Sequence, residues 1–255
     1  MSRRCKARVE RVLLRWYWFS RRAIAPTLRY SQYLYEDTLR CYLPRETMWL
    51  DLGCGRRVLP EWRSQQEKAL VTRSQTLVGL DYDLDSLRAN RSVHLRVRGS
   101  AEQLPFTSNT FDLVTANMVV EHAEDPRSLL RDVQRVLRPG GTFIFHTPNA
   151  FGYVVMLARA IPEWAKPRLI YVLQGRREED VFQTHYRMNT AGVIGELAEA
   201  SRFEVVEIRL LVSDAALAVI PPLATLELLW IRALMTAPLK PLRTNIIAIL
   251  RKPAA

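Results

Sequence analysis

Short runs of apolar residues recur along the chain from residue 48 onward, separated by longer segments in which apolar and polar residues mix. The runs predict buried strands, and the mixed segments predict amphipathic helices. The clearest helices are expected at 127–137, which Pro139-Gly140-Gly141 ends, and at 190–200. Strands that alternate with helices imply right-handed βαβ units and a doubly wound, mostly parallel α/β sheet with helices on both faces. Strands are expected at 48–51, 76–81, 93–97, 111–116, 142–146, 204–212 and 245–250.

Two longer segments interrupt this alternation, at 149–189 and at 213–243, and the second is conspicuously apolar. Structureless loops of this length are uncommon in compact domains, so both insertions are expected to be partly helical. The chain before the first strand also has the pattern of helices. The predicted organisation is therefore a basic helical leader over 1–43, packed on or beside a single α/β domain over 44–255 that carries both insertions.

The net charge of the chain is +11, and most of it lies at one end. Residues 1–48 hold eleven basic and four acidic side chains, which places +7 there. Such an excess attracts anionic partners without saying of which kind. The three cysteines, Cys5, Cys41 and Cys54, fit neither a disulfide framework nor a zinc site, which favours a reducing cytoplasm. Neither a signal peptide nor a run of 18 uncharged apolar residues is apparent.

The strongest local signal is the turn Asp51-Leu52-Gly53-Cys54-Gly55, directly after the first predicted strand. Glycines allow the backbone to approach a ligand closely, and a strand-to-helix turn presents free amides. The glycine spacing differs from that of nucleotide-phosphate loops, and the acid at the strand end suits a cationic or hydroxyl-rich ligand. Asp81 ends the next predicted strand, where a carboxylate can accept two hydrogen bonds from a ribose diol.

Further motifs follow these two acids in a fixed order. They are Gly99-Ser100-Ala101-Glu102-Gln103-Leu104-Pro105-Phe106, Phe111-Asp112-Leu113-Val114, Glu121-His122, Leu137-Arg138-Pro139-Gly140-Gly141 and Thr147-Pro148-Asn149. In this order and spacing, the set resembles the class I S-adenosylmethionine-dependent methyltransferases, particularly the type 11-like group that methylates small molecules and lipids. The resemblance covers about residues 30–211 and the last strand. It implies a Rossmann-like sheet of seven strands, the last of them antiparallel, with ligands at the carboxyl ends of the parallel strands.

The resemblance also implies S-adenosylmethionine as the methyl donor and assigns residues of this chain to it. The positions that would contact it are Asp51, Gly53 and Gly55 at the methionine moiety, Asp81 at the ribose hydroxyls, Tyr82, Ala101 and Glu102 at the adenine ring, and Asn117 and His122 beside the methyl-transfer centre.

Two positions depart from the family pattern. Arg57 stands where the family often has a third glycine, so the first helix is expected to begin differently, and Arg56 or Arg57 to meet an anionic group. Ser100 stands where many relatives carry an aspartate for the adenine amino group, which implies weaker or rearranged adenine binding. These departures keep open a non-catalytic protein that retains the fold for binding or scaffolding.

Methyl transfer from a sulfonium needs little acid–base chemistry, because alignment in a dry site supplies most of the rate. Transfer to a hydroxyl oxygen also needs a base to take its proton, and the candidates are His122 and His185. A structural hydrogen bond is the competing interpretation of each. His94 and His146 lie within predicted strands and are expected to be packing residues, and no metal cluster is visible in the sequence.

The basic, aromatic leader around Arg15-Trp16-Tyr17-Trp18-Phe19 has three interpretations. It could lie on an anionic membrane surface, grip nucleic acid through phosphates and stacking, or simply pack on the domain. The apolar insertion favours the first, because it would not help an enzyme that acts on RNA. We therefore expect a small-molecule or lipid-like acceptor and O-methylation ahead of C- or N-methylation. We also expect a cytoplasmic protein that contacts the inner membrane surface peripherally. A soluble small molecule and an RNA acceptor remain alternatives.

Overall fold

The computed structural model describes residues 3–161, 183–218 and 220–254. Its strands are β1 (Thr47–Leu52), β2 (Ser74–Asp81), β3 (Leu95–Arg98), β4 (Phe111–Asn117), β5 (Leu137–Pro148), β6 (Glu204–Leu211) and β7 (Asn245–Arg251). Its α-helices are α1 (Arg3–Ile24), α2 (Ser31–Tyr42), α3 (Ser64–Val71), α4 (Leu84–Ala89), α5 (Pro126–Val136), α6 (Tyr153–Ala160), α8 (Ala191–Ala200) and α9 (Pro221–Leu234). Short 3₁₀ turns are η1 (Glu61–Arg63), η2 (Val120–His122) and η5 (Lys240–Leu242). All seven predicted strands are therefore present, each within a few residues of its predicted ends.

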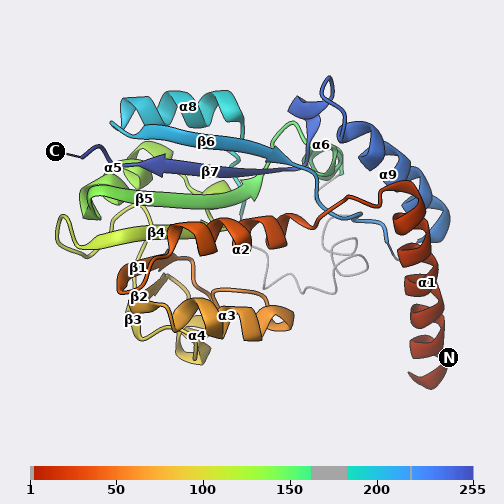
Figure 1. Cartoon of the computed structure of the whole chain (residues 1–255), viewed down its shortest axis with the longest axis horizontal. Coiled ribbons are helices and arrows are strands. Elements are labelled where there is room, and N and C mark those ends of the chain that lie inside the picture. The colour runs from red at the N-terminus through yellow and green to blue at the C-terminus, as the bar shows by residue number, and fades with distance from the viewer. Residues whose placement is uncertain (1–2, 162–182, 219, 255) are drawn as a thin grey trace. The chain divides into compact units, whose positions relative to one another are not determined.

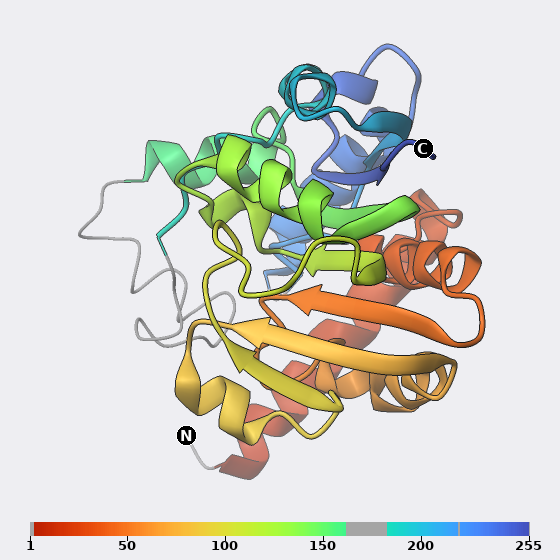
Figure 2. The same cartoon turned by 90° about the vertical axis from the view of Figure 1, so that its left-hand side faces the viewer.

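The strands form one sheet in the order β3-β2-β1-β4-β5-β7-β6 (Figure 1). The pairs from β3 to β5 are parallel. The last strand runs the other way, since the amide of Gly140 donates to the carbonyl of Lys252 and the amide of Lys252 donates to the carbonyl of Gly141. Figure 2 shows α2 and α5 on opposite faces of this sheet. The predicted doubly wound, mostly parallel α/β fold with an antiparallel last strand is confirmed.

Local sequence explains where the helices of the sheet begin. Asp83, Asp125 and Thr190 each accept a backbone N–H of the first turn of the following helix, as N-capping residues do. Pro126 then occupies the first position of α5, where its missing N–H costs nothing. The helix ends at Val136 and β5 begins at the next residue. The Pro-Gly-Gly motif therefore lies inside the strand rather than in a loop between the two elements.

The chain divides into two compact units. The first contains the described residues within Met1–Tyr33, Asn149–Phe182 and Leu210–Asn245, and the second contains Leu34–Pro148, those within Gln183–Arg209 and those within Ile246–Ala255. The boundary between the two units falls within α2. The leader itself is two helices, with Pro26 in the segment between them.

The first unit is built around the contact of α1 with α9. Tyr17 packs with Ala224 and Leu228, and a second cluster joins α1's end to Ile231 and Leu234. Helices are thus present in the described parts of both insertions, as predicted. None of the helices in the described ranges is long and apolar enough to cross a membrane.

Candidate functional site

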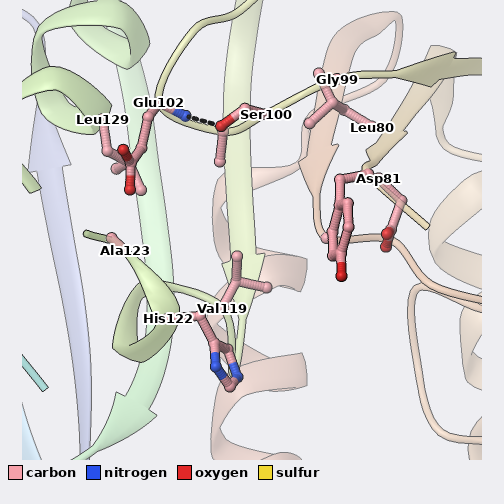
Figure 3. A pocket seen from close by; sticks show the side chains of 12 residues that line it. Leu80, Asp81, Gly99, Ser100, Glu102, Val119, His122, Ala123 and Leu129 are labelled. Atoms are coloured by element: carbon pink, nitrogen blue, oxygen red, sulfur yellow. Dashed lines mark hydrogen bonds between the residues drawn. The ribbon is translucent and has the colours of Figure 1, made fainter. Parts of the chain in front are cut away.

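A cavity of about 310 Å³ lies at the carboxyl ends of the parallel strands of the second unit. Its walls come from the end of β2 and from the segments that follow β1, β2, β3 and β4, with one residue from α5. Figure 3 shows the side chains around it. The lining residues are Gly53, Leu80, Asp81, Tyr82, Gly99, Ser100, Ala101, Glu102, Val119, His122, Ala123 and Leu129. Six of the predicted site residues are therefore brought together here: Gly53, Asp81, Tyr82, Ala101, Glu102 and His122.

The turn after β1 reaches the cavity through Gly53. Its φ of +63° is a conformation that favours glycine, and a Cβ built on it would lie 2.4 Å from Cγ2 of Val119. Gly55 also has a positive φ, of +46°, but a Cβ there would meet open space. The first glycine therefore supplies room for close approach, and the second supplies only backbone freedom. Gly55 itself does not line the cavity.

Asn90 holds this turn in place, and sequence reasoning missed it. Its side chain is fully buried, and its Nδ2 donates to the carbonyls of Cys54 (3.1 Å) and Gly55 (3.0 Å). Its Oδ1 accepts the amides of Ser92 (2.8 Å) and Val93 (3.2 Å). One amide thus ties the glycine turn to the segment before β3. Nothing in the local sequence distinguishes this asparagine from a surface one.

Asp81 lies at the end of β2 and lines the cavity with both carboxylate oxygens already in use. Oδ2 accepts the amide of Gly55 at 2.7 Å, and Oδ1 accepts the amide of Asp83 at 2.9 Å. A carboxylate has about four acceptor sites, so these bonds orient it and leave capacity for two hydroxyl donors. Tyr82 beside it is 61 % exposed, so its ring is available to a flat ligand.

The loop after β3, residues 99–102, forms another wall of the cavity. Ser100 Oγ accepts the amide of Glu102 at 3.1 Å, which tightens the loop (Figure 3). The Glu102 carboxylate accepts the amides of Glu124 (2.6 Å) and Asp125 (3.1 Å), which connects the loop to the start of α5. Ser100 therefore has a structural role at the position where many relatives carry an acid.

Asp51 is buried and does not line the cavity. Its carboxyl accepts the hydroxyl of Thr115 at 2.5 Å, and Thr115 in turn accepts the indole N–H of Trp49 at 2.7 Å. Burial raises the pKa of Asp51 to about 8, because the charged form loses its hydration and no arginine or lysine among the described residues forms an ion pair with it. A buried acid of this kind suits a cationic group.

The segment after β1 carries Arg57. The first α-helix after β1 is α3, which begins at Ser64, after η1. The anionic group that meets Arg57 is Glu67 of the same chain, at 3.2 Å, and Glu67 is otherwise buried. The same carboxylate accepts the amides of Val58 (2.9 Å) and Leu59 (3.2 Å). Glu67 is a second structural residue that the sequence did not reveal.

The four histidines of the chain have different surroundings. His122 lines the cavity, and its Nδ1 lies 2.7 Å from the carbonyl oxygen of Gln183. Because a carbonyl only accepts, Nδ1 carries the hydrogen, and Nε2 is the basic nitrogen of the neutral ring. His185 is not among the lining residues, and its Nε2 lies 3.8 Å from a carboxylate oxygen of Glu124.

Of the other two histidines, His146 is a packing residue, as predicted, whereas His94 is exposed and lies just before β3 rather than within a strand. His94 Nδ1 accepts the amide of Leu77 at 2.8 Å. His146 is buried, stacks on Tyr35 and donates from Nδ1 to Asn117 Oδ1 at 2.9 Å. Burial lowers the pKa of His146 to about 3, so its ring is neutral. Asn117 is thus engaged with β5 and does not line the cavity.

The turn η2, which carries His122, is bonded to the chain segment that begins at Gln183. The carbonyl of Glu121 accepts the amides of His185 (2.8 Å) and Tyr186 (3.1 Å). The Glu121 side chain is buried, accepts the hydroxyl of Thr147 at 3.0 Å, and has its pKa raised to about 7 by that burial. The position of His122 therefore depends on main-chain bonds on both sides of the turn.

Comparison with protein families places this cavity in a known context. Residues 50–145 match the family model described as Methyltransferase domain. The Ubiquinone biosynthesis O-methyltransferase of Pseudomonas syringae pv. tomato is 32% identical over 127 residues, which cover 44% of this chain and 50% of the relative. The chain thus matches about half the length of that curated relative.

Comparison with solved structures supports the same fold. An S-adenosylmethionine-dependent methyltransferase from Mesorhizobium loti matches 84% of this chain and 96% of its own, with a TM-score of 0.55 and 20% identity. The [4+2]-cyclase SpnF matches 86% of this chain and 81% of its own, with a TM-score of 0.54 and 16% identity. At these identities the likeness concerns the fold alone, and the second neighbour's name shows that the fold also occurs in a protein named for another reaction.

Proposed function

Because residues 50–145 belong to the methyltransferase domain family of class I fold, we propose that this chain transfers a methyl group from S-adenosylmethionine to a small-molecule or lipid-like acceptor. The observation that carries the proposal is the single cavity in which Gly53, Asp81, the loop 99–102 and His122 meet at the strand ends. Transfer to a hydroxyl oxygen by in-line displacement is the reaction that we infer.

The residues present fit the donor molecule. Asp81 offers acceptors to ribose hydroxyls, Tyr82 offers a flat ring to the adenine with Ala101 and Glu102 facing it, and Gly53 leaves space where a Cβ would collide with Val119. We propose that the buried carboxyl group of Asp51, two residues before Gly53, helps to orient the ammonium group of the donor. When bound, S-adenosylmethionine supplies an activated methyl group on a positively charged sulfur. We propose that Gly55 and Asn117 contribute through the turn and the strand end that carry them.

His122 is the residue that we assign to the acceptor's proton. Its ring lies in the cavity wall. Because Nδ1 donates its hydrogen to the Gln183 carbonyl, we propose that Nε2 accepts the proton. The lining of the cavity also includes the apolar residues Leu80, Val119 and Ala123. His185 remains the second candidate, tied to the same turn through Glu121.

The nature of the acceptor is inferred from two kinds of support. The curated relatives are named for methylation of an oxygen in ubiquinone biosynthesis, which favours an O-methyl transfer and an acceptor with an apolar part. The first unit carries exposed apolar side chains on α6 and α9, which favours contact with a lipid-like molecule. We propose a cytoplasmic protein that meets such an acceptor at the membrane surface. Nothing in the cavity favours RNA over these acceptors.

The decisive experiment is calorimetric titration of the full chain with S-adenosylmethionine. We expect one-to-one binding that Asp81→Ala weakens strongly, because the ribose acceptors are lost. Asp85→Ala removes the same charge from an 87 % exposed side chain nearby and should bind like the native chain. Absence of binding by the folded protein, or equal binding by both variants, would overturn the proposal and favour a non-catalytic use of the fold.

A further inference from the structure

The first unit exposes an unusual amount of apolar surface on α9. The inner face of this helix is already packed. Ala224 and Leu228 are fully buried in a cluster with Tyr17 of α1, and Ile231 is fully buried in a cluster with Ala25 and Leu28, which follow α1. Its outer face is also apolar: Leu223, Leu226, Leu229 and Trp230 are 43, 64, 53 and 39 % exposed. A surface helix normally carries polar residues on its outer face, so this pattern calls for a partner.

α1 packs beside α9 (Figure 1). It adds exposed aromatic residues to this unit. Phe19 is 73 % exposed and Trp18 is 46 % exposed. Tyr17, by contrast, points inward and packs on α9. Tryptophan is typical of the interface between lipid and water because its ring is apolar and its N–H is polar, and phenylalanine is typical of the apolar face of interfacial helices.

The charged side chains of this unit also differ between its interior and its surface. Arg21 is structural, since it pairs with Asp214 at 2.5 Å and donates to the carbonyl of Leu28. Glu227 is buried, where it accepts the hydroxyl of Tyr153 and the amide of Ala216. Every fully exposed charged side chain that the structure describes in this unit is an arginine or a lysine, among them Arg15, Arg22, Arg232 and Lys240. An anionic partner is therefore favoured over a neutral or cationic one.

In the part of this unit that the structure describes, apolar and aromatic side chains are exposed and the exposed charged ones are basic, and together they indicate the chemistry of the partner. A nucleic acid would use the arginines and the aromatic rings, but the leucines of α9 would gain nothing from phosphates or base edges. An anionic lipid surface uses all three, because acyl chains accept the apolar side chains while lipid headgroups attract the basic ones.

We infer that the outer face of α9, with Trp18, Phe19 and Arg22 of α1, is a docking surface for an anionic lipid bilayer. This α9 docking surface would hold the protein peripherally, in the plane of the headgroups. The inference deepens the proposed function by naming a membrane partner, yet it stands on residues of the first unit and can fail separately.

The test is sedimentation of the full chain with sucrose-loaded vesicles, made either of phosphatidylcholine alone or with about a third phosphatidylglycerol. We expect binding to the anionic vesicles that exceeds binding to the neutral ones and weakens with added salt, because screening reduces the headgroup attraction. Leu226→Asp and Phe19→Asp should each lower the partition coefficient about tenfold or more, because an apolar side chain no longer enters the lipid.

The matched control is Leu95→Asp, which makes the same change at a 56 % exposed leucine of β3 in the second unit. It should bind vesicles nearly as the native chain does. Equal losses in all three variants, or equal binding to neutral and anionic vesicles, would overturn the docking surface. A stable dimer that Leu226→Asp dissociates would overturn it too, by assigning the face to a second copy of the chain. Far-ultraviolet circular dichroism of each variant shows that it is folded. Because neither this control nor vesicle binding uses S-adenosylmethionine, the outcome is separate from that of the methyl-transfer proposal.

Discussion

The main-chain N–H of Gly55 donates a 2.7 Å hydrogen bond to the carboxylate of Asp81. The bond joins the turn after β1 to the end of β2, so the two most informative motifs of the sequence form one structural unit. It also fixes the carboxylate that we assign to the ribose. A change in the turn should therefore be felt at Asp81, although the two residues are 26 positions apart in the chain.

Gly53→Ala should destabilise the protein and abolish cofactor binding. Alanine at this position would keep a positive φ, which is unfavourable for it, and its Cβ would collide with Val119. Each effect alone costs roughly 1–3 kcal/mol. Gly55→Ala, which meets open space, should show only the smaller backbone cost. Urea unfolding measures both. If the two variants lose the same free energy of unfolding, the close approach of Gly53 to Val119 is not the cause.

Asn90→Ala should loosen the glycine turn. Four hydrogen bonds disappear and buried backbone groups of Cys54, Gly55 and Val93 lose their partner, which predicts a loss of about 2–4 kcal/mol in the free energy of unfolding. Asn90→Asp keeps the acceptor for the amides but places a carboxylate against two carbonyls, so it should not rescue stability. Recovery of native stability in that variant would contradict the assigned amide orientation.

His122→Gln should separate binding from reaction. Cofactor affinity is expected to change little, while the rate of transfer to a hydroxyl acceptor falls about 10²–10⁴-fold, the usual contribution of a positioned base. His94→Gln alters a histidine that serves only the amide of Leu77 and is the control. Steady-state kinetics with a phenolic acceptor would measure the effect. A larger loss in His185→Gln than in His122→Gln would transfer the role to His185.

The buried acid Asp51 should make stability fall as pH rises. Its pKa in the folded protein is about 8, above the value near 4 of an unfolded aspartate. Between these values the folded state binds one proton more than the unfolded state, so this contribution is fully present below pH ~4 and is lost as pH approaches 8. Asp51→Asn, which keeps an acceptor for Thr115, should flatten that decline. Thermal unfolding from pH 5 to pH 9 tests this, and an unchanged slope would contradict the assignment.

The sequence predicted the fold well because apolar runs and the mixed segments between them are local signals. The strands, α5 and α8 follow directly from the lengths of these segments, and the structure adds that Asp125 and Thr190 cap the two helices. The join of α5 to β5 was less predictable, since Pro139 and Gly140 resemble a loop yet continue the strand.

The site was predictable only in part. Motif residues that line the cavity, such as Gly53, Asp81 and His122, stand at strand ends, where topology gathers them. The structural roles of Asn90 and Glu67 were not predicted, because each side chain binds main-chain atoms. Every residue type supplies these atoms, so the sequence does not show where such a bond forms. The inward direction of Asp51 likewise depends on its partner Thr115, which lies 64 residues away.

One consequence of the bond between His122 and residue 183 concerns tolerance to substitution. The atom that selects the ring's tautomer is a main-chain oxygen, and the side chain of Gln183 has no part in that contact. A saturation library should therefore accept many residues at position 183, whereas removing or adding one residue there should impair the enzyme. The number of residues in this segment therefore matters for function more than the type of residue at position 183. The residue types that position 183 tolerates would not reveal its importance.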